Sequence, residues 1–181
     1  MSKTLIAYFS RSGENFVNGN VESLPTGNTE LIAQIIEDQT AGDMFKIQTT
    51  YDYPADYKEC TEVAKEELKN HMRPEVKDMP ESIDEYENVI VGFPNWWDTM
   101  PMAVYTFLEE YNWSGKNVLP FCTHEGGGAG NSEKEIIKIC QGADVKPILV
   151  IQGANAADAA PQVKEWLDKN MPNEKDRSQT H

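Results

Sequence analysis

Short runs of apolar residues alternate with longer amphipathic stretches along most of the chain. Each apolar run has the length of a strand that is buried on both faces, and the amphipathic stretches carry apolar residues at helical spacing. The runs predict buried strands over residues 5–9, 89–93, 117–122 and 147–151, and a more exposed strand over 43–48. The amphipathic stretches predict helices over residues 28–39, 54–71 and 101–111, from residue 132 onward, and over 158–170.

This alternation of strands and helices is typical of a parallel sheet that helices cover on both faces. Five such units predict an α/β fold, a doubly wound three-layer sandwich with a five-stranded parallel sheet. We see no internal repeat and no interdomain linker, so we expect one domain over residues 1–171 and a polar tail over 172–181. Because ligands of such sheets bind beyond the carboxyl ends of the strands, we expect a site in the segments that follow them.

Composition narrows the classes of function. The 181 residues include 30 acidic and 16 basic side chains, which gives a formal net charge of -14. Contacts to phosphate backbones need clustered lysine and arginine, so this charge argues against nucleic acid and against an anionic membrane as partners. An acidic surface suits docking onto a basic protein, but acidity also simply keeps proteins in solution, and composition alone does not choose between these interpretations.

The N-terminus and the cysteines indicate the cellular compartment of the protein. The first residues start a strand-like apolar run at once, without the charged n-region or the cleavage site of a signal peptide. No apolar run approaches the roughly 20 residues that span a bilayer. The three cysteines, Cys60, Cys122 and Cys140, lie far apart and form no C-x-x-C pair, which argues against a disulfide framework. These features predict a cytoplasmic protein.

Two segments near the first predicted strand have the composition of an anion site. Ser10–Gly13 follows the strand, and Gly27–Thr29 directly precedes a helix. Hydroxyls, glycines and free backbone N–H groups at a helix N-terminus are what a phosphate dianion needs. Taken alone, such a segment is also an ordinary turn, and Asn28 is an ordinary helix cap.

Two further loops follow later strands. Pro94–Thr99 contains two adjacent tryptophans that cannot both point into one core, so at least one should lie against a flat partner or form an interface anchor. Thr123–Asn131 carries four glycines in five positions, which lets the backbone approach a planar ligand, although a flexible surface loop has the same composition. The three loops would meet at one end of the sheet, so together they predict a site for a phosphorylated planar aromatic molecule.

His124 and Glu125 in the third loop are candidates for acid–base chemistry. One histidine and one glutamate are too few ligands for a dedicated metal site, so we expect no metal. A polar loop residue is an equally good interpretation of His124.

The stretches Tyr8–Gly13, Gly27–Glu30, Gly92–Trp97 and Pro120–Gly127 resemble the flavodoxin family, and the resemblance extends to about residue 170. It implies a flavodoxin-like sheet of order 2-1-3-4-5 that binds flavin mononucleotide (FMN) noncovalently. It also implies that cofactor-binding residues come from all three loops. From the first loop these are Ser10, Arg11, Ser12, Gly13, Asn28 and Thr29, which would surround the phosphate. From the second they are Pro94, Asn95, Trp96, Trp97, Asp98 and Thr99, which would flank the isoalloxazine ring. From the third they are Thr123, His124, Gly126, Gly127 and Gly128, which would border its other edge.

Two positions depart from the family pattern. Most relatives have an unbroken phosphate loop, whereas Glu14–Thr26 interrupts it here and leaves open whether Gly13 or Gly27 supplies the tight turn. Asp98 follows the tryptophans where many relatives have glycine, the residue that most easily lets a peptide flip beside the flavin. We expect the two half-loops to close on one phosphate.

The resemblance implies an electron carrier that holds one or two electrons on FMN, exchanges them with protein partners and needs no catalytic residue. The alternative is an FMN-dependent NAD(P)H oxidoreductase of the quinone or FMN reductase type, for which Arg11 and Lys116 are the basic candidates near the site. A response regulator shares the strand order but needs an acidic pair after strand one and an aspartate after strand three. Ser10–Arg11 and Pro94–Asn95 stand there instead, which argues against that class.

Overall fold

The computed structural model describes residues 3–172, and its centre is a parallel sheet of order β4-β1-β5-β6. The strands are β1 (Lys3–Tyr8), β4 (Asp43–Lys46), β5 (Tyr86–Pro94) and β6 (Asn117–His124). Two short strands, β7 (Asp144–Val145) and β8 (Leu149–Gln152), pair with the first and the last residues of β6. The predicted fold and strand order are confirmed. The fifth position is divided because Pro147, between the two strands, lacks the N–H that a ladder needs.

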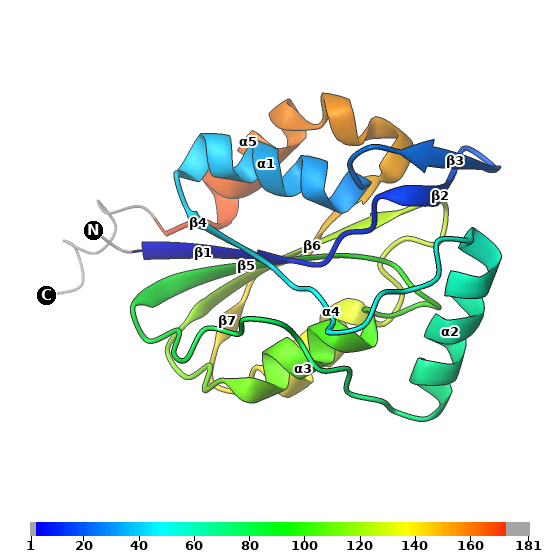
Figure 1. The fold of residues 1–181 in the computed structure, drawn as a ribbon. Helices are drawn as coiled ribbons and strands as arrows, with labels where there is room; N and C mark the ends of the chain where they lie inside the picture. Colours follow the sequence, from blue (N-terminus) through cyan, green and yellow to red (C-terminus); the bar gives the residue numbers. More distant parts are fainter. Residues whose placement is uncertain (1–2, 173–181) are drawn as a thin grey trace, which may run out of the picture.

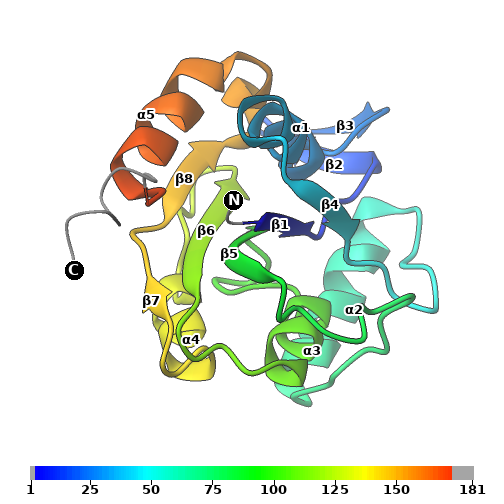
Figure 2. The same ribbon diagram turned by 90° about the vertical axis from the view of Figure 1, so that its left-hand side faces the viewer.

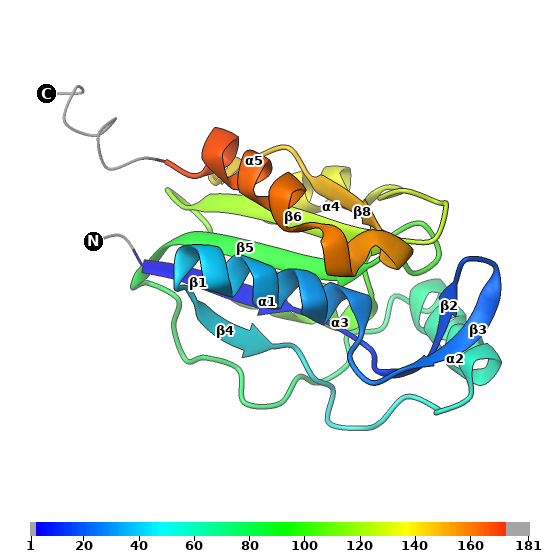
Figure 3. The ribbon, with the colours of Figure 1, turned by 90° about the horizontal axis from the view of Figure 1, so that it is seen from above.

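Helices cover both faces of this sheet (Figures 1 and 2). One face carries α1 (Asn28–Thr40), the 3-10 helix η1 (Gly153–Asp158) and α5 (Ala160–Asn170), which Figure 3 shows from above. The other face carries α3 (Met102–Glu110) and α4 (Ser132–Ile139). Successive side chains of a strand point to opposite faces, so Ile6 and Tyr8 of β1 join the core under α1, and Leu5 and Ala7 join the core around α3.

The segment that interrupts the phosphate-loop pattern is an antiparallel hairpin of β2 (Gly13–Val17) and β3 (Asn20–Leu24). Its tip residues Asn18 and Gly19 both have positive φ, as a two-residue hairpin turn requires. Helix α2 (Tyr57–Lys69) contacts β2, and both lie beyond the carboxyl ends of the strands (Figures 1 and 3). The carboxyl end of the sheet is therefore walled by a hairpin and a helix.

Three further observations bear on the sequence-based expectations. The three cysteines are buried and unpaired. Within residues 3–172, no helix combines the length and the apolar character needed to cross a membrane. Residues 173–181, most of the expected polar tail, lie outside the described part of the chain.

Candidate functional site

Two adjoining cavities lie at the carboxyl end of the sheet. The smaller, of about 130 Å³, has Ser10, Asn28, Thr29 and Thr123 in its wall, and we call it the strand-one cavity. The larger, of about 390 Å³, lies between α2 and the tryptophan loop, and we call it the α2 cavity. The two cavities form one cleft because they share the wall residues Arg11, Asn15, Tyr57, Asn95 and Trp96.

The two half-loops of the first segment meet at the start of α1. Ser10 Oγ accepts a hydrogen bond of 3.1 Å from the Glu30 N–H group. A Cβ atom at Gly27 would overlap Ser10 Oγ and the Arg11 carbonyl oxygen, so only glycine permits this close approach. Gly13 has a different role: it is the first residue of the hairpin, and its φ of 82° lies in the left-handed region. Gly27 has no side chain to cap α1, so apart from the Glu30 N–H group, which bonds to Ser10, the first N–H groups of the helix are left for another acceptor.

Thr29 ties the first loop to the third. Its hydroxyl shares a 2.8 Å hydrogen bond with the Thr123 hydroxyl, and both residues are buried. Ser12 and Gly13 lie elsewhere: they line a third cavity of about 650 Å³, which shares Ser10, Arg11 and Trp96 with the strand-one cavity. Ser10 thus lines both the strand-one cavity, beside the start of α1, and the third cavity, whereas Ser12 and Gly13 line only the third.

Arg11 lines all three cavities. Its guanidinium donates to two backbone carbonyl oxygens, those of Glu14 at 3.0 Å and Ala55 at 2.8 Å. Among the ion pairs of residues 3–172, none involves Arg11, so its charge faces the cleft without a carboxylate partner. The placement of Lys116 near the site was wrong. Lys116 is buried before β6, at the amino end of the sheet, and donates to the Ile83 and Tyr86 carbonyl oxygens.

The two tryptophans of the second loop point in different directions, as expected. Trp96 is half-buried and packs edge-on against Phe9 and Tyr53, with ring centroids 5.0 and 5.3 Å away. Trp97 is 48% exposed, and its indole N–H donates to the Thr61 carbonyl oxygen of α2 at 2.9 Å. Trp96 therefore forms the wall of the cleft, and Trp97 joins the loop to α2.

The turn of this loop has unusual backbone angles. Trp97 and Asp98 have φ values of 55° and 64°, which residues other than glycine rarely adopt. Trp96 and Thr99 enclose them in an antiparallel bridge. Such residues persist where the surroundings hold them, and they are common at ligand sites.

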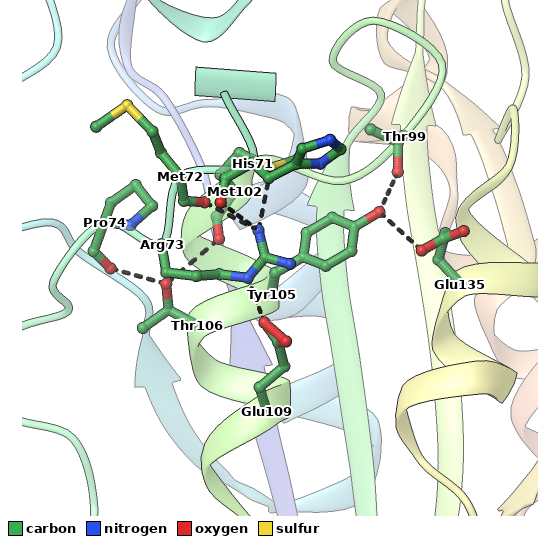
Figure 4. A network of polar contacts seen from close by, with 10 residues as sticks. All are labelled: His71, Met72, Arg73, Pro74, Thr99, Met102, Tyr105, Thr106, Glu109 and Glu135. Carbon is green, nitrogen blue, oxygen red and sulfur yellow. Dashed lines mark hydrogen bonds and ion pairs between the residues drawn. The ribbon is translucent and has the colours of Figure 1, made fainter. Parts of the chain in front are cut away.

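A polar network behind the turn keeps this backbone conformation in place (Figure 4). The Thr99 hydroxyl bonds to the Tyr105 hydroxyl of α3 at 2.7 Å, and Tyr105 donates to Glu135 of α4 at 3.4 Å. The Arg73 guanidinium lies over the Tyr105 ring and pairs with Glu109. Thr99 is thus buried behind the turn and anchors the loop to two helices.

The second and third loops are in direct contact. The Asn95 side chain donates to the Gly128 carbonyl oxygen at 2.7 Å, while its Oδ1 atom is buried and has no partner within the described residues. The Asp98 carbonyl oxygen accepts from the Asn131 N–H group at 2.8 Å. His124 Nδ1 accepts from the Gly126 N–H group of its own loop. Of the residues predicted from the second and third loops, those that line neither cavity of the cleft are Asp98, Thr99, Gly126, Gly127 and Gly128, and their contact with a ligand stays a prediction.

Glu125 places a carboxylate in the strand-one cavity. Its Oε2 atom accepts a 3.2 Å hydrogen bond from the Asn18 N–H group at the hairpin tip, and its Oε1 atom is buried without a partner in the described part of the chain. A Cβ atom at Gly153 would overlap both Glu125 Oε1 and the Asn28 side-chain nitrogen. The carboxylate therefore lies beside the start of α1.

Sequence reasoning missed several wall residues: Asn15 and Phe16 from the hairpin, Tyr57 and Cys60 from α2, and Gly153. Gly153 had a usable signal, since it directly follows β8 and the rule about strand ends applies to it. The hairpin and α2 residues had none, because only the tertiary arrangement brings them to the cleft.

Comparisons with known proteins agree with this architecture. The model of the flavodoxin family matches residues 3–170. A solved structure from Bacteroides eggerthii DSM 20697, assigned as a flavoprotein, is 27% identical, with a TM-score of 0.76 and coverage of 96% of this chain and 100% of that one. A search of curated proteins found none that matches this sequence.

Two more distant structures show the shared fold. A flavoprotein from Lactobacillus acidophilus NCFM, solved in complex with FMN, is 19% identical, with a TM-score of 0.64 and coverage of 92% of this chain and 99% of that one. A protein from Klebsiella pneumoniae assigned as a quinone reductase is 13% identical, with a TM-score of 0.52 and coverage of 96% and 86%.

Proposed function

Because this chain belongs to the flavodoxin family, we propose that it binds FMN noncovalently in the cleft and exchanges one or two electrons with protein partners. The observation that carries the proposal is the cleft itself, in which the start of a helix adjoins a cavity walled by aromatic side chains. The related fold of a flavoprotein in complex with FMN supports the same ligand. When bound, FMN supplies the electron chemistry, and the protein supplies its binding and surroundings.

The strand-one cavity fits a phosphate group. Apart from the Glu30 N–H group, which bonds to Ser10, the first N–H groups of α1 are open to a ligand, and the helix dipole favours an anion there. The side chains of Ser10 and Asn28 and the guanidinium of Arg11 line the same cavity and provide further donors. We assign these groups to the phosphate and the adjoining polar chain of FMN.

The tryptophan loop fits a planar heterocycle with N–H groups. Asn95 Oδ1 is a buried acceptor that lacks a donor within the described residues, and an unpaired buried acceptor costs about 1–3 kcal/mol. A ligand N–H group would remove that cost. Contacts with Phe9 and Tyr53 hold Trp96 in place, so Trp96 provides a rigid wall for the heterocycle.

The acidic composition supports partner proteins with basic docking surfaces. A net charge of -14 steers cations and repels other acidic proteins. We expect electron transfer to such a partner to slow as the salt concentration rises, because salt screens this attraction.

One observation favours the alternative, an FMN-dependent NAD(P)H oxidoreductase of the quinone or FMN reductase type. The α2 cavity offers about 390 Å³ beside Arg11, whose charge has no carboxylate partner in the described ion pairs. Room and a cation together suit a small anionic co-substrate.

The visible spectrum of the purified protein, before and after titration with FMN, tests the binding proposal. We expect a yellow protein or stoichiometric uptake of FMN, and a colourless protein that takes up none would refute the proposal. Mixing the loaded protein with NAD(P)H and a quinone separates the two functions. A carrier leaves NAD(P)H unoxidised until a separate reductase is added, whereas the alternative predicts steady consumption without one.

A further inference from the structure

Glu125 is a negative charge in the cavity to which the proposed function assigns the phosphate. It shares the wall of the strand-one cavity with Ser10 and Asn28, and it lies with Asn28 against Gly153. Its Oε1 atom is buried without a partner in the described residues, so nothing there compensates that oxygen. A carboxylate in this position takes up the favourable potential that the start of α1 offers to an anion.

A phosphate group and the Glu125 carboxylate cannot both use this position at low cost. The cavity holds about 130 Å³, and like charges brought together in such a space repel strongly. Arg11 is the cation in the same wall, and its guanidinium is already held by two backbone carbonyl oxygens. The arrival of a phosphate therefore favours movement of the Glu125 side chain out of the cavity.

That movement has a consequence for the hairpin. The bond from the Asn18 N–H group to Glu125 Oε2 joins the hairpin tip to the loop after β6, across 107 positions of sequence. If the carboxylate leaves, the N–H group loses its acceptor and the tip loses this attachment. Phosphate binding and tip attachment are then coupled, and the coupling acts in both directions.

We propose that Glu125 is an internal anion that the phosphate of the ligand displaces. It lowers the affinity for FMN relative to riboflavin, which lacks the phosphate, and it releases the hairpin tip when FMN binds. The proposal rests on the assignment of the cleft to FMN and concerns the regulation of that same site.

The first experiment compares two flavins by fluorescence titration of wild-type protein and Glu125→Gln. The substitution keeps the size of the side chain and an acceptor for Asn18 but removes the charge. We expect the Kd for FMN to fall about tenfold and the Kd for riboflavin to stay within about twofold. Glu22→Gln, on the exposed strand β3, is the control for net charge and should change neither constant. Weaker FMN binding by Glu125→Gln, or an equal change for both flavins, would overturn the proposal.

The second experiment needs no flavin. The backbone amide signal of Asn18 is followed by NMR while inorganic phosphate is added to the wild-type protein. We expect a saturable shift and faster hydrogen exchange of this amide, and we expect Glu125→Ala to exchange fast before any addition. An Asn18 amide that stays unchanged as phosphate is added refutes the displacement. If phosphate shifts the amide but the titrations of the first experiment show no flavin binding, the displacement stands and the FMN assignment fails.

Discussion

At the scale of single residues, Gly27 joins the two parts of a divided loop. Its backbone lies so close to Ser10 and Arg11 that there is no room for a Cβ atom. The sequence left open whether Gly13 or Gly27 supplies the tight turn, because both are glycines that flank the insertion. The structure assigns the close approach to Gly27 and the left-handed backbone to Gly13.

Gly27→Ala should therefore separate the half-loops. The added methyl group must displace Ser10 or the Arg11 carbonyl, at a cost of about 1–3 kcal/mol in the free energy of unfolding. FMN affinity should fall as well, since Ser10 moves away from the start of α1. Urea unfolding and flavin titration measure the two effects, and Thr26→Ala, one residue earlier, should show neither. Wild-type stability in Gly27→Ala would contradict this account.

Tyr86 links the start of β5 to the start of β4, on the two sides of β1, and makes stability depend on pH. Its hydroxyl donates to Asp43 at 2.8 Å, and burial together with the nearby carboxylate raises the pKa of Tyr86 to about 12. In the unfolded chain the pKa of a tyrosine is about 10. The contribution is complete below pH 10 and is lost as the pH rises toward 12, because only the unfolded state then gives up the proton.

The variant Tyr86→Phe should reduce the free energy of unfolding by about 1 kcal/mol at pH 8, the usual value of one hydrogen bond. Between pH 10 and 12 its stability should fall less steeply than that of the wild type, so the two curves converge. Urea unfolding at pH 8, 10 and 11 gives the comparison. Parallel curves would show that the hydroxyl titrates alike in both states.

The sequence predicts well which residues at strand ends line the cleft, but it does not predict which other residues they contact. Ser10, Asn95 and Trp96 were predicted because parallel strands bring their carboxyl ends to one edge, and Thr29 because it stands at the start of a helix; all four line the cleft. Lys116 was misplaced although the same rule excludes it, since it precedes its strand. Glu125 was noticed as a chemical group, but its contact with the hairpin depends on a fold that local pattern does not contain.

At the scale of elements, the hairpin and α2 are the least predictable parts. The periodicity predicted a helix over residues 54–71, and α2 occupies Tyr57–Lys69. Its position beyond the strand ends follows from contacts with β2, such as the 2.6 Å bond from the Tyr57 N–H group to the Glu14 carboxylate. A helix pattern gives the apolar face but not the element that the face meets.

Removing Glu14–Gly27 tests whether the hairpin belongs to the site. The deletion joins Gly13 to Asn28 and restores an uninterrupted loop, but it also removes Asn15 and Phe16 from the cleft wall. We expect a folded protein with native circular dichroism and an FMN affinity at least about tenfold lower. Val21→Ser, at a 52% exposed position of β3, is the control and should bind FMN normally. Unchanged affinity after the deletion would show that the hairpin is an accessory.

At the scale of the whole molecule, two buried cysteines can report on the opening of the core. Cys122 lies in β6 and Cys140 follows α4, and both are almost fully buried. Burial raises the pKa of each thiol to about 12, so the reactive thiolate is scarce in the native state. Their reactivity therefore reports how often the core opens.

We expect neither Cys122 nor Cys140 to react with an aromatic disulfide reagent at pH 8 in the native protein. Both should react once urea unfolds the sheet, at rates that follow the unfolded fraction. Mass spectrometry of trapped peptides distinguishes the two thiols. Fast labelling of Cys122 without denaturant would mean that β6 opens locally, against its central position in the sheet.

The overall architecture was the most predictable level. Continuous apolar strands between amphipathic helices leave few topologies, and the resemblance to flavodoxins selected the order that the sheet has. The break between β7 and β8 was not foreseen, because a proline near the start of an apolar run is compatible with either one strand or two. The net charge was visible from composition, but a partner is a property of another molecule.

The hairpin also makes the protein a starting point for engineering. It leaves the sheet at Gly13 and returns at Gly27, beside Ser10, so a sequence grafted at Asn18–Gly19 would alter neither the core nor the strand order. A recognition peptide placed there would sit on the attachment between the tip and Glu125. If the cleft binds FMN as proposed, capture of the peptide's target should change flavin fluorescence, and the chain would be a self-contained optical biosensor.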